Sequence, residues 1–251
     1  MVSATICTVR KYPAKLIPIS LVLCGFVFLR MLAIIYENPK FGVHHPWACP
    51  RRDGKLAYRE SDVNMTFDNS FDNNTGADHF IVPNIIHFIR YNQFELNFVD
   101  YVVLKAALRN HNPDKFFIHT NILNVQYTGK YWNLVQNDLG LWSRIKVLFL
   151  QIPTTVFGRA VSKKWRLHHG SDIARLWILR KYGGIYLDND AYVVRCLDKY
   201  RKFEAVVNCG VNDTVGNQVI IAHKNARFLT AWKNSYKYYN EDLWYKLKTE
   251  V

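Results

Sequence analysis

The sequence predicts an α/β domain of the Rossmann-like type, and three observations support this prediction. The apolar run 81–89 indicates a strand, and its Pro83 suits a first or edge strand better than an interior one. A helix predicted over Phe98–Arg109 separates it from a second strand over Lys115–Thr120. The order strand, helix, strand indicates a parallel crossover. The third observation is the stretch 171–190.

This stretch predicts a helix, a glycine stop and a short buried strand. Ile173–Tyr182 is rich in helix formers, with Ser171 as the expected N-cap and Gly183-Gly184 where a left-handed residue ends a helix. The apolar run 185–187 is too short for a helix and favours a strand that is buried on both faces.

Two carboxylates follow that strand. Asp188 and Asp190 are two residues apart, so in extended backbone they point to the same side. Two adjacent carboxylates repel each other, and a hard divalent cation such as Mg²⁺ or Mn²⁺ relieves that repulsion. In open α/β sheets, ligands bind beyond the carboxyl ends of the strands. An isolated Asp-x-Asp is also compatible with a solvated turn.

Asp172 and Arg175 are three residues apart at the start of the predicted helix, so they share a face and can reach one ligand. The alternative interpretation is that Asp172 complements the helix dipole and forms only a weak surface ion pair with Arg175.

The segment His169–Asp190 resembles the sugar-binding region of glycosyltransferases with an Asp-x-Asp motif, in particular α-1,4-galactosyltransferases, α-1,4-N-acetylglucosaminyltransferases and initiating α-1,6-mannosyltransferases. It is also similar to the glucosylating domain of large clostridial toxins. The resemblance implies a nucleotide-sugar-binding domain of the GT-A type. In it Asp172 and Arg175 contact the donor sugar and Asp190 holds the metal directly. Asp188 contacts ribose, sugar or a metal-bound water, and so belongs to both the donor and the metal site.

The strand 81–89 is similar to the first sheet strand of the same families. The resemblance implies that His87, Phe88 and Ile89 lie near the nucleotide base and that Arg90 lies near phosphate. A core strand with a satisfied histidine is an equally good interpretation of His87.

The beginning of the chain predicts a membrane anchor. Residues 16–36 are largely apolar around a single Arg30, and about twenty such residues span a bilayer. Basic residues precede this segment and no acid occurs before Glu37, which predicts a cytosolic tail over residues 1–15 and a lumenal remainder. A signal anchor is favoured over a cleaved signal peptide because no clean small-residue cleavage site follows.

Residues 37–80 are rich in Asn, Asp and Pro and predict a lumenal stem before a catalytic domain over residues 81–251. Asn64, Asn73 and Asn212 begin glycosylation acceptor triplets, which agree with the lumenal side.

Three of the five cysteines fall on the predicted lumenal side. An oxidising lumen permits a disulfide, and Cys196 with Cys209 is the pair we expect. In the resembling families the chain continues well past the segment that corresponds to 216–222, so either the domain is minimal or the sequence is truncated at its C-terminus. By the same analogy Asn217 and Gln218 reach the sugar, with entry into a core strand as the alternative.

The formal net charge of +13 would suit a nucleic-acid partner, but the predicted lumenal topology argues against one. The paired histidines His168-His169 and His44-His45 lack spaced cysteine or carboxylate partners, so they are weak evidence for zinc.

The resemblance therefore implies a Golgi type II membrane glycosyltransferase. It would use Mn²⁺ or Mg²⁺ to transfer a hexose or N-acetylhexosamine, with retention, from a UDP-sugar to a glycan on lipid or protein. A GDP-mannose-dependent mannosyltransferase and a noncatalytic lumenal glycan-binding protein are the alternatives. The catalytic residue and the oligomeric state stay unassigned.

Overall fold

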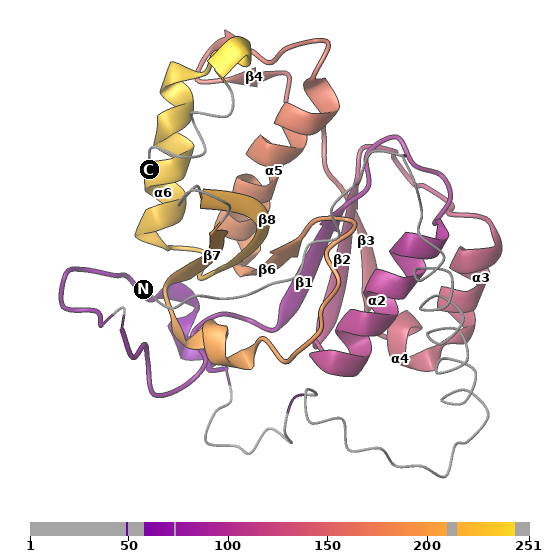
Figure 1. Ribbon diagram of the computed structural model, residues 1–251, viewed down its shortest axis with the longest axis horizontal. Helices are drawn as coiled ribbons and strands as arrows, with labels where there is room; N and C mark the ends of the chain where they lie inside the picture. Colours follow the sequence, from indigo (N-terminus) through magenta and orange to yellow (C-terminus); the bar gives the residue numbers. More distant parts are fainter. Residues whose placement is uncertain (1–48, 50–57, 73, 210–214, 244–251) are drawn as a thin grey trace, which may run out of the picture.

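A computed structural model describes Cys49 and residues 58–72, 74–209 and 215–243 (Figure 1). Its centre is a six-stranded sheet in the order β3-β2-β1-β6-β8-β7. The four strands from β3 to β6 run parallel, whereas β8 is antiparallel to both β6 and β7. The strands are β1 Ile85–Ile89, β2 Lys115–Thr120, β3 Ile145–Phe149, β6 Gly184–Leu187, β7 Ala205–Cys209 and β8 Val215–Ala222. A separate hairpin joins β4 Thr155–Val156 to β5 Arg159–Ala160.

Helices cover both faces of the sheet. Figure 1 shows α2, α3 and α4 on one side and α5 and α6 on the other. The α-helices are α2 Phe98–Asn110, α3 Lys130–Asn137, α4 Leu139–Trp142, α5 Arg166–Tyr182 and α6 Arg227–Ser235. Short 3₁₀ helices are η2 Glu60–Asn64, η3 Asp198–Lys202, η5 Tyr236–Tyr238 and η6 Glu241–Leu243.

Alternating residues of β6 pack into two separate cores. Ile185 and Leu187 of β6 belong to the core with α2, whereas Tyr186 between them belongs to the core with α5 and α6. This alternation follows from the two-residue period of a strand, and it makes every residue of β6 buried. The prediction of a strand buried on both faces is confirmed.

The parallel crossover is confirmed, but the position of its first strand differs from the prediction. β1 pairs with β2 and with β6, so it is an interior strand and not an edge strand. The sheet tolerates Pro83 because that residue lies before Ile85, where the strand begins, and the missing N–H therefore costs no ladder hydrogen bond.

The start of α5 also differs from the prediction. The helix begins at Arg166, and the residue before it, Trp165, provides no side-chain cap. Ser171 is therefore not the N-cap: it lies inside the helix, where its hydroxyl donates to the Leu167 carbonyl at 2.6 Å. Such a bond to the preceding turn satisfies a serine within a helix. The predicted stop is confirmed, because Gly183 has a φ of 64° and caps the helix.

The predicted anchor over residues 16–36 lies outside the described residues. Among those that are described, no helix is both long enough and apolar enough to cross a membrane. The described part of the predicted stem lies against the domain: Phe80 is buried, and Met65 and Phe67 pack on the α2 core. Asn64 is exposed, while Asn73 and Asn212 are outside the described residues, so glycosylation stays a prediction.

The predicted disulfide partner of Cys196 is wrong. Cys196 bonds to Cys49, 147 residues away, rather than to Cys209. Two segments that are distant in sequence approach each other in the fold, and cysteine spacing carries no information about such an approach.

Candidate functional site

A cavity of about 590 Å³ opens at the carboxyl edge of the parallel strands. Its lining comes from the end of β1, the start of α2, one face of α5, the turn after β6 and the start of β8. All six polar residues that the sequence assigned to sugar or metal line this one cavity: Asp172, Arg175, Asp188, Asp190, Asn217 and Gln218. The fold therefore brings together residues that are up to 46 positions apart in the sequence.

Arg175 is the centre of the polar network. Its Nη2 lies 2.9 Å from Asp172 Oδ1, and its Nη1 donates to the Asn217 carbonyl at 2.5 Å. The same Nη1 is 3.3 Å from Asp188 Oδ1. Asn217 closes the ring, because its Nδ2 donates to Asp172 Oδ1 at 2.7 Å. These contacts connect α5, β8 and the end of β6, so three elements fix the position of one guanidinium.

Tyr186 supports this network from the sheet. Its hydroxyl donates to Asp188 Oδ1 at 2.8 Å, and the Arg175 guanidinium lies 4.5 Å from the centre of its ring. Because Tyr186 is almost fully buried, both contacts are shielded from water. The buried face of the Asp188 carboxylate is thus held in place, while 27% of its side chain remains exposed.

The charges of the network affect one another. Burial disfavours the charge of Arg175, but Tyr186, Asp172 and Asp188 outweigh burial and raise its pKa above the ordinary value. Burial also raises the pKa of Asp188, and Asp172 and Asp190 add to that rise, whereas Arg175 and Tyr186 oppose it. An additional positive charge beside Asp188 would therefore be favourable.

The motif Asp188-Asn189-Asp190 fits a hard divalent cation. Asp190 is exposed, and no described residue makes an ion pair with it. The Asn189 Oδ1 atom is buried and has no hydrogen-bond partner among the described residues. Two carboxylates and an unpaired amide oxygen are hard oxygen donors, a type that suits Mn²⁺ or Mg²⁺ better than zinc.

Another group of metal-ligand side chains lies away from this cavity. Potential ligand atoms of Cys49, His111, Cys196 and Asp198 lie within 4.8 Å of one another. The two sulfur atoms are joined in the disulfide, and Asp198 is paired with Arg201 at 2.7 Å. The disulfide of this cluster therefore links Cys49 covalently to the segment after β6.

The residues that were assigned to the nucleotide base separate into two groups. Ile89, the last residue of β1, lines the cavity, whereas Phe88 is buried in the core with α2 and His87 is fully buried. His87 Nε2 is 2.8 Å from the Gly183 carbonyl, and its Nδ1 is 3.0 Å from His119 Nε2. The structure thus agrees with the alternative interpretation of His87 as a core histidine whose hydrogen bonds are satisfied. Of His87, Phe88 and Ile89, only Ile89 lies at the cavity wall.

Arg90, which was expected near phosphate, is also buried. Its Nη2 is 2.9 Å from Asp100 Oδ1, and both side chains are only 3% exposed. Asp100 lines the cavity, whereas Arg90 does not line it and lies behind Asp100.

Part of the cavity wall comprises residues that the sequence patterns did not assign to a site. Gln93 and Asn97 lie between β1 and α2, and Asp100 lies in the first turn of that helix. Asn97 and Asp100 form a reciprocal capping box, with hydrogen bonds of 2.8 and 3.0 Å. The spacing of these two residues directly after a predicted strand was the available signal. His168 on α5 was considered only as half of a zinc pair, yet it also lines this cavity.

The comparison with protein families decides the assignment. Residues 81–207, just over half of the 251 residues, match the glycosyltransferase sugar-binding region containing the DXD motif. The chain belongs to this family. The matched residues include Asp172, Arg175, Asp188 and Asp190, and they end before Asn217. The chain thus carries a glycosyltransferase domain, and Asp188-Asn189-Asp190 is its Asp-x-Asp motif.

Two individual proteins are similar to this glycosyltransferase. Glucan organizing enzyme 1 of Cryptococcus neoformans var. grubii is 29% identical over 160 residues, which cover 60% of this chain and 40% of that protein. The solved structure of the PaToxG glycosyltransferase is 16% identical, with a TM-score of 0.44, and the match covers 67% of this chain and 65% of that one.

Proposed function

We propose that this glycosyltransferase transfers a hexose or N-acetylhexosamine from a UDP-sugar to a hydroxyl of a glycan on lipid or protein, with the help of a divalent cation. The observation that carries the proposal is the network of Asp172, Arg175, Asp188 and Asn217 beside the exposed Asp190. A charged network of this kind, built from three elements and left open to a cavity, suits a polar ligand.

The proposed reaction breaks the bond between the anomeric carbon and the diphosphate oxygen of the donor. The acceptor oxygen forms the new bond to that carbon, and the acceptor proton leaves to the departing diphosphate. The sugar passes through a state that resembles an oxocarbenium ion. Asp172 and Asn217 would orient the sugar hydroxyls, and Arg175 would hold the Asp172 carboxylate and the Asn217 backbone carbonyl in place.

Asp190 and Asp188 would hold the cation, with Asn189 as a further oxygen donor. When bound, a divalent cation neutralises the charge that develops on a diphosphate leaving group. Ile89 would pack against the base, since it is the cavity residue at the end of β1.

The proposal includes a type II Golgi membrane topology and retention of the anomeric configuration. The apolar segment 16–36 and its basic flank support the topology. Retention and the GT-A type rest on the family resemblance, and the domain division at residue 80 rests on the composition of residues 37–80.

Donor hydrolysis tests the proposal. The full chain in detergent is incubated with Mn²⁺ and a panel of UDP-galactose, UDP-N-acetylglucosamine, UDP-glucose and GDP-mannose, and the free sugar is measured. UDP-glucose is included because the name of the Cryptococcus relative refers to glucan. We expect turnover of one UDP-sugar, loss of activity without the cation, and a loss of about a hundredfold or more in Asp190→Asn.

Asp68→Asn is the matched control, because Asp68 is an exposed acid outside the cavity. Turnover of GDP-mannose alone would support the mannosyltransferase alternative. No turnover and no binding of any donor would support the noncatalytic one.

A further inference from the structure

We propose that a second cavity, at the N-terminal end of α5, binds the acceptor as an oligosaccharide. This inference rests on the proposed function, because it names where the second substrate of the same reaction binds. The cavity measures about 760 Å³, which is within the range of about 300–1,000 Å³ for small-molecule sites. Its lining includes Arg159, Lys163, Trp165, Asn240 and Asp242.

One face of α5 leads from the donor cavity to this second cavity. Asp172, Arg175 and His168 line the donor cavity, and Trp165 lines the second one. Positions three, four and seven apart lie on the same side of a helix. The rings of Trp165 and His168 are 5.8 Å apart, so the two cavities adjoin at this pair.

The spacing suits a ligand longer than one sugar ring. Seven residues separate Trp165 from Asp172, which corresponds to roughly 10 Å along the helix axis. An acceptor that offers its terminal hydroxyl at Asp172 can therefore extend its next sugar rings towards Trp165.

Trp165 can provide an apolar platform for a sugar ring. It is 43% exposed, and its ring stacks on His169 at 6.4 Å with an interplanar angle of 22°. Lys164 Nζ lies over the ring at 5.1 Å and would move aside for a sugar, since no described residue forms an ion pair with it. Aromatic side chains with a polar handle are well suited to such amphipathic ligands.

The rest of the cavity can bind hydroxyl groups. Asn240, Glu241 and Asp242 are exposed side chains that accept hydrogen bonds from sugars. The floor is held rigidly, because the Tyr239 hydroxyl is 3.0 Å from both His169 Nδ1 and the Ser162 backbone nitrogen. A polar cavity with a fixed floor and an exposed aromatic ring at Trp165 fits a glycan better than a lipid chain.

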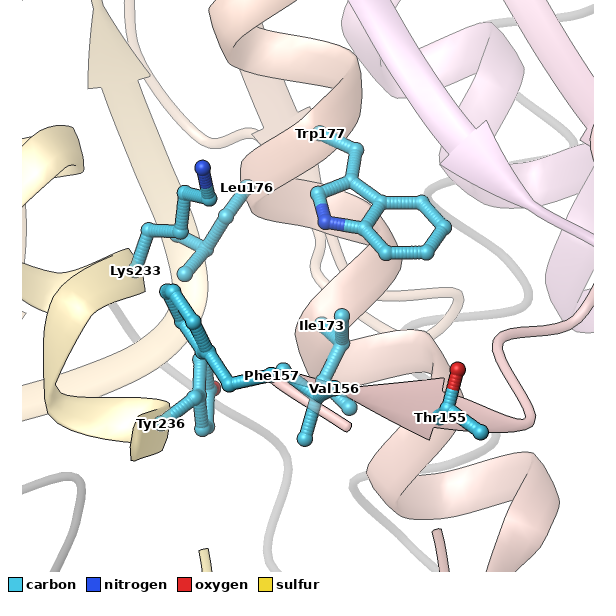
Figure 2. A pocket seen from close by; sticks show the side chains of 8 residues that line it. All are labelled: Thr155, Val156, Phe157, Ile173, Leu176, Trp177, Lys233 and Tyr236. Carbon is cyan, nitrogen blue, oxygen red and sulfur yellow. The ribbon is translucent and has the colours of Figure 1, made fainter. Parts of the chain in front are cut away.

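The opposite face of α5 provides a matched control. Figure 2 shows an apolar pocket of about 260 Å³ between this helix, the β4–β5 hairpin and α6, with Trp177 at its edge. Trp177 is 39% exposed, close to the 43% of Trp165, and it lies on α5, which Trp165 directly precedes. It lines neither of the two cavities on the α5 face described above.

Binding of disaccharides tests the inference without requiring turnover. Saturation-transfer NMR is recorded on the full chain with lactose, cellobiose and α-1,6-mannobiose. We expect wild type to bind at least one of them, Trp165→Ala to weaken that binding by about tenfold, and Trp165→Phe to restore most of it. Trp177→Ala should bind as wild type does.

The same variants are then assayed for the ratio of transfer to donor hydrolysis, which should fall in Trp165→Ala through a higher KM for the acceptor. The inference is overturned if no disaccharide binds, or if Trp165→Ala and Trp177→Ala behave alike. Failure of donor hydrolysis in wild type would instead contradict the proposed function, because disaccharide binding does not depend on it.

Discussion

At the residue scale, Arg175 decides whether the donor cavity keeps its shape. It contacts the buried Asp172, the Asn217 carbonyl and the Asp188 carboxylate from a position that is itself only 5% exposed. Removing one partner of a buried ion pair leaves an uncompensated charge, which costs more than the pair contributes. Arg175 therefore stabilises the fold as well as the site.

Arg175→Met should lower the free energy of unfolding by about 3 kcal/mol or more, because Asp172 would remain buried without its cation. Urea unfolding measures this change. The double variant Arg175→Met/Asp172→Leu should recover part of the loss, and Arg180→Met on the same helix is the control. Equal stability of Arg175→Met and Arg180→Met would contradict the role of the pair.

Two buried histidines give the stability a defined pH dependence. Burial lowers the pKa of His87 to about 4, although its hydrogen bond with Gly183 opposes the shift. Burial, with smaller effects of His87 and Lys181, lowers the pKa of His119 to about 3. Both side chains are therefore neutral in the folded protein at pH 7.

The unfolded chain binds these protons below about pH 6.5, whereas the folded chain does not. Stability should thus be complete above pH 6.5 and fall as the pH decreases towards 4, by about 1.4 kcal/mol per pH unit for each histidine. Urea unfolding at several pH values measures the slope. His119→Asn should make it shallower, and an unchanged slope would contradict this explanation.

At the element scale, the two glycines after α5 allow β6 to approach β1. Gly184 has a φ of 111°, and a Cβ there would lie 2.6 Å from the Ile85 carbonyl oxygen and 2.8 Å from His87 Nε2. The glycine pair therefore ends the helix and also brings the strand that carries the Asp-x-Asp motif against the centre of the sheet. His87 fills the space beneath it.

Gly184→Ala should destabilise the protein by about 3 kcal/mol or more, since the steric clash adds to the backbone strain. Gly158→Ala is the matched control: its φ of 76° is also positive, but nothing lies within 4 Å of a Cβ there. It should cost only about 1–2 kcal/mol. Thermal unfolding of the two variants compares them, and equal losses would show that the close approach is unimportant.

The elements also show what sequence patterns can and cannot predict. The boundaries of β2 and the stop of α5 at Gly183 follow from local propensity, so both were predicted. The interior place of β1 depends on pairing with β6, which is distant in sequence. The N-terminal extension of α5 as far as Arg166 was missed because serine favours caps, although its hydroxyl can also bond within a helix.

At the scale of the whole molecule, the same distinction applies to the site. The motif residues on α5 and after β6 were predicted because each belongs to a local sequence pattern. Gln93, Asn97 and Asp100 were not predicted. The capping-box spacing of Asn97 and Asp100 is a local signal for the start of α2, but the packing of α2 against the sheet brings these residues to the cavity. The disulfide partner Cys49 was missed for the same reason.

The Cys49–Cys196 bond links the segment before the domain to the segment after β6. Nonreducing peptide mapping should yield a linked pair that contains Cys49 and Cys196. Reduction should lower the free energy of unfolding by about 2–5 kcal/mol, since a long loop is released in the unfolded chain. A linked pair of Cys196 and Cys209 would contradict this connection.

We propose above all that the edge of the sheet with the Asp-x-Asp motif binds a nucleoside diphosphate together with a divalent cation. Isothermal titration of the full chain with UDP in the presence of Mn²⁺ measures this binding without requiring an acceptor. We expect saturable binding at one site, its loss on removal of Mn²⁺, and an affinity lower by about tenfold or more in Asp190→Asn. No binding by wild type, or equal affinity in wild type and Asp190→Asn, would contradict it.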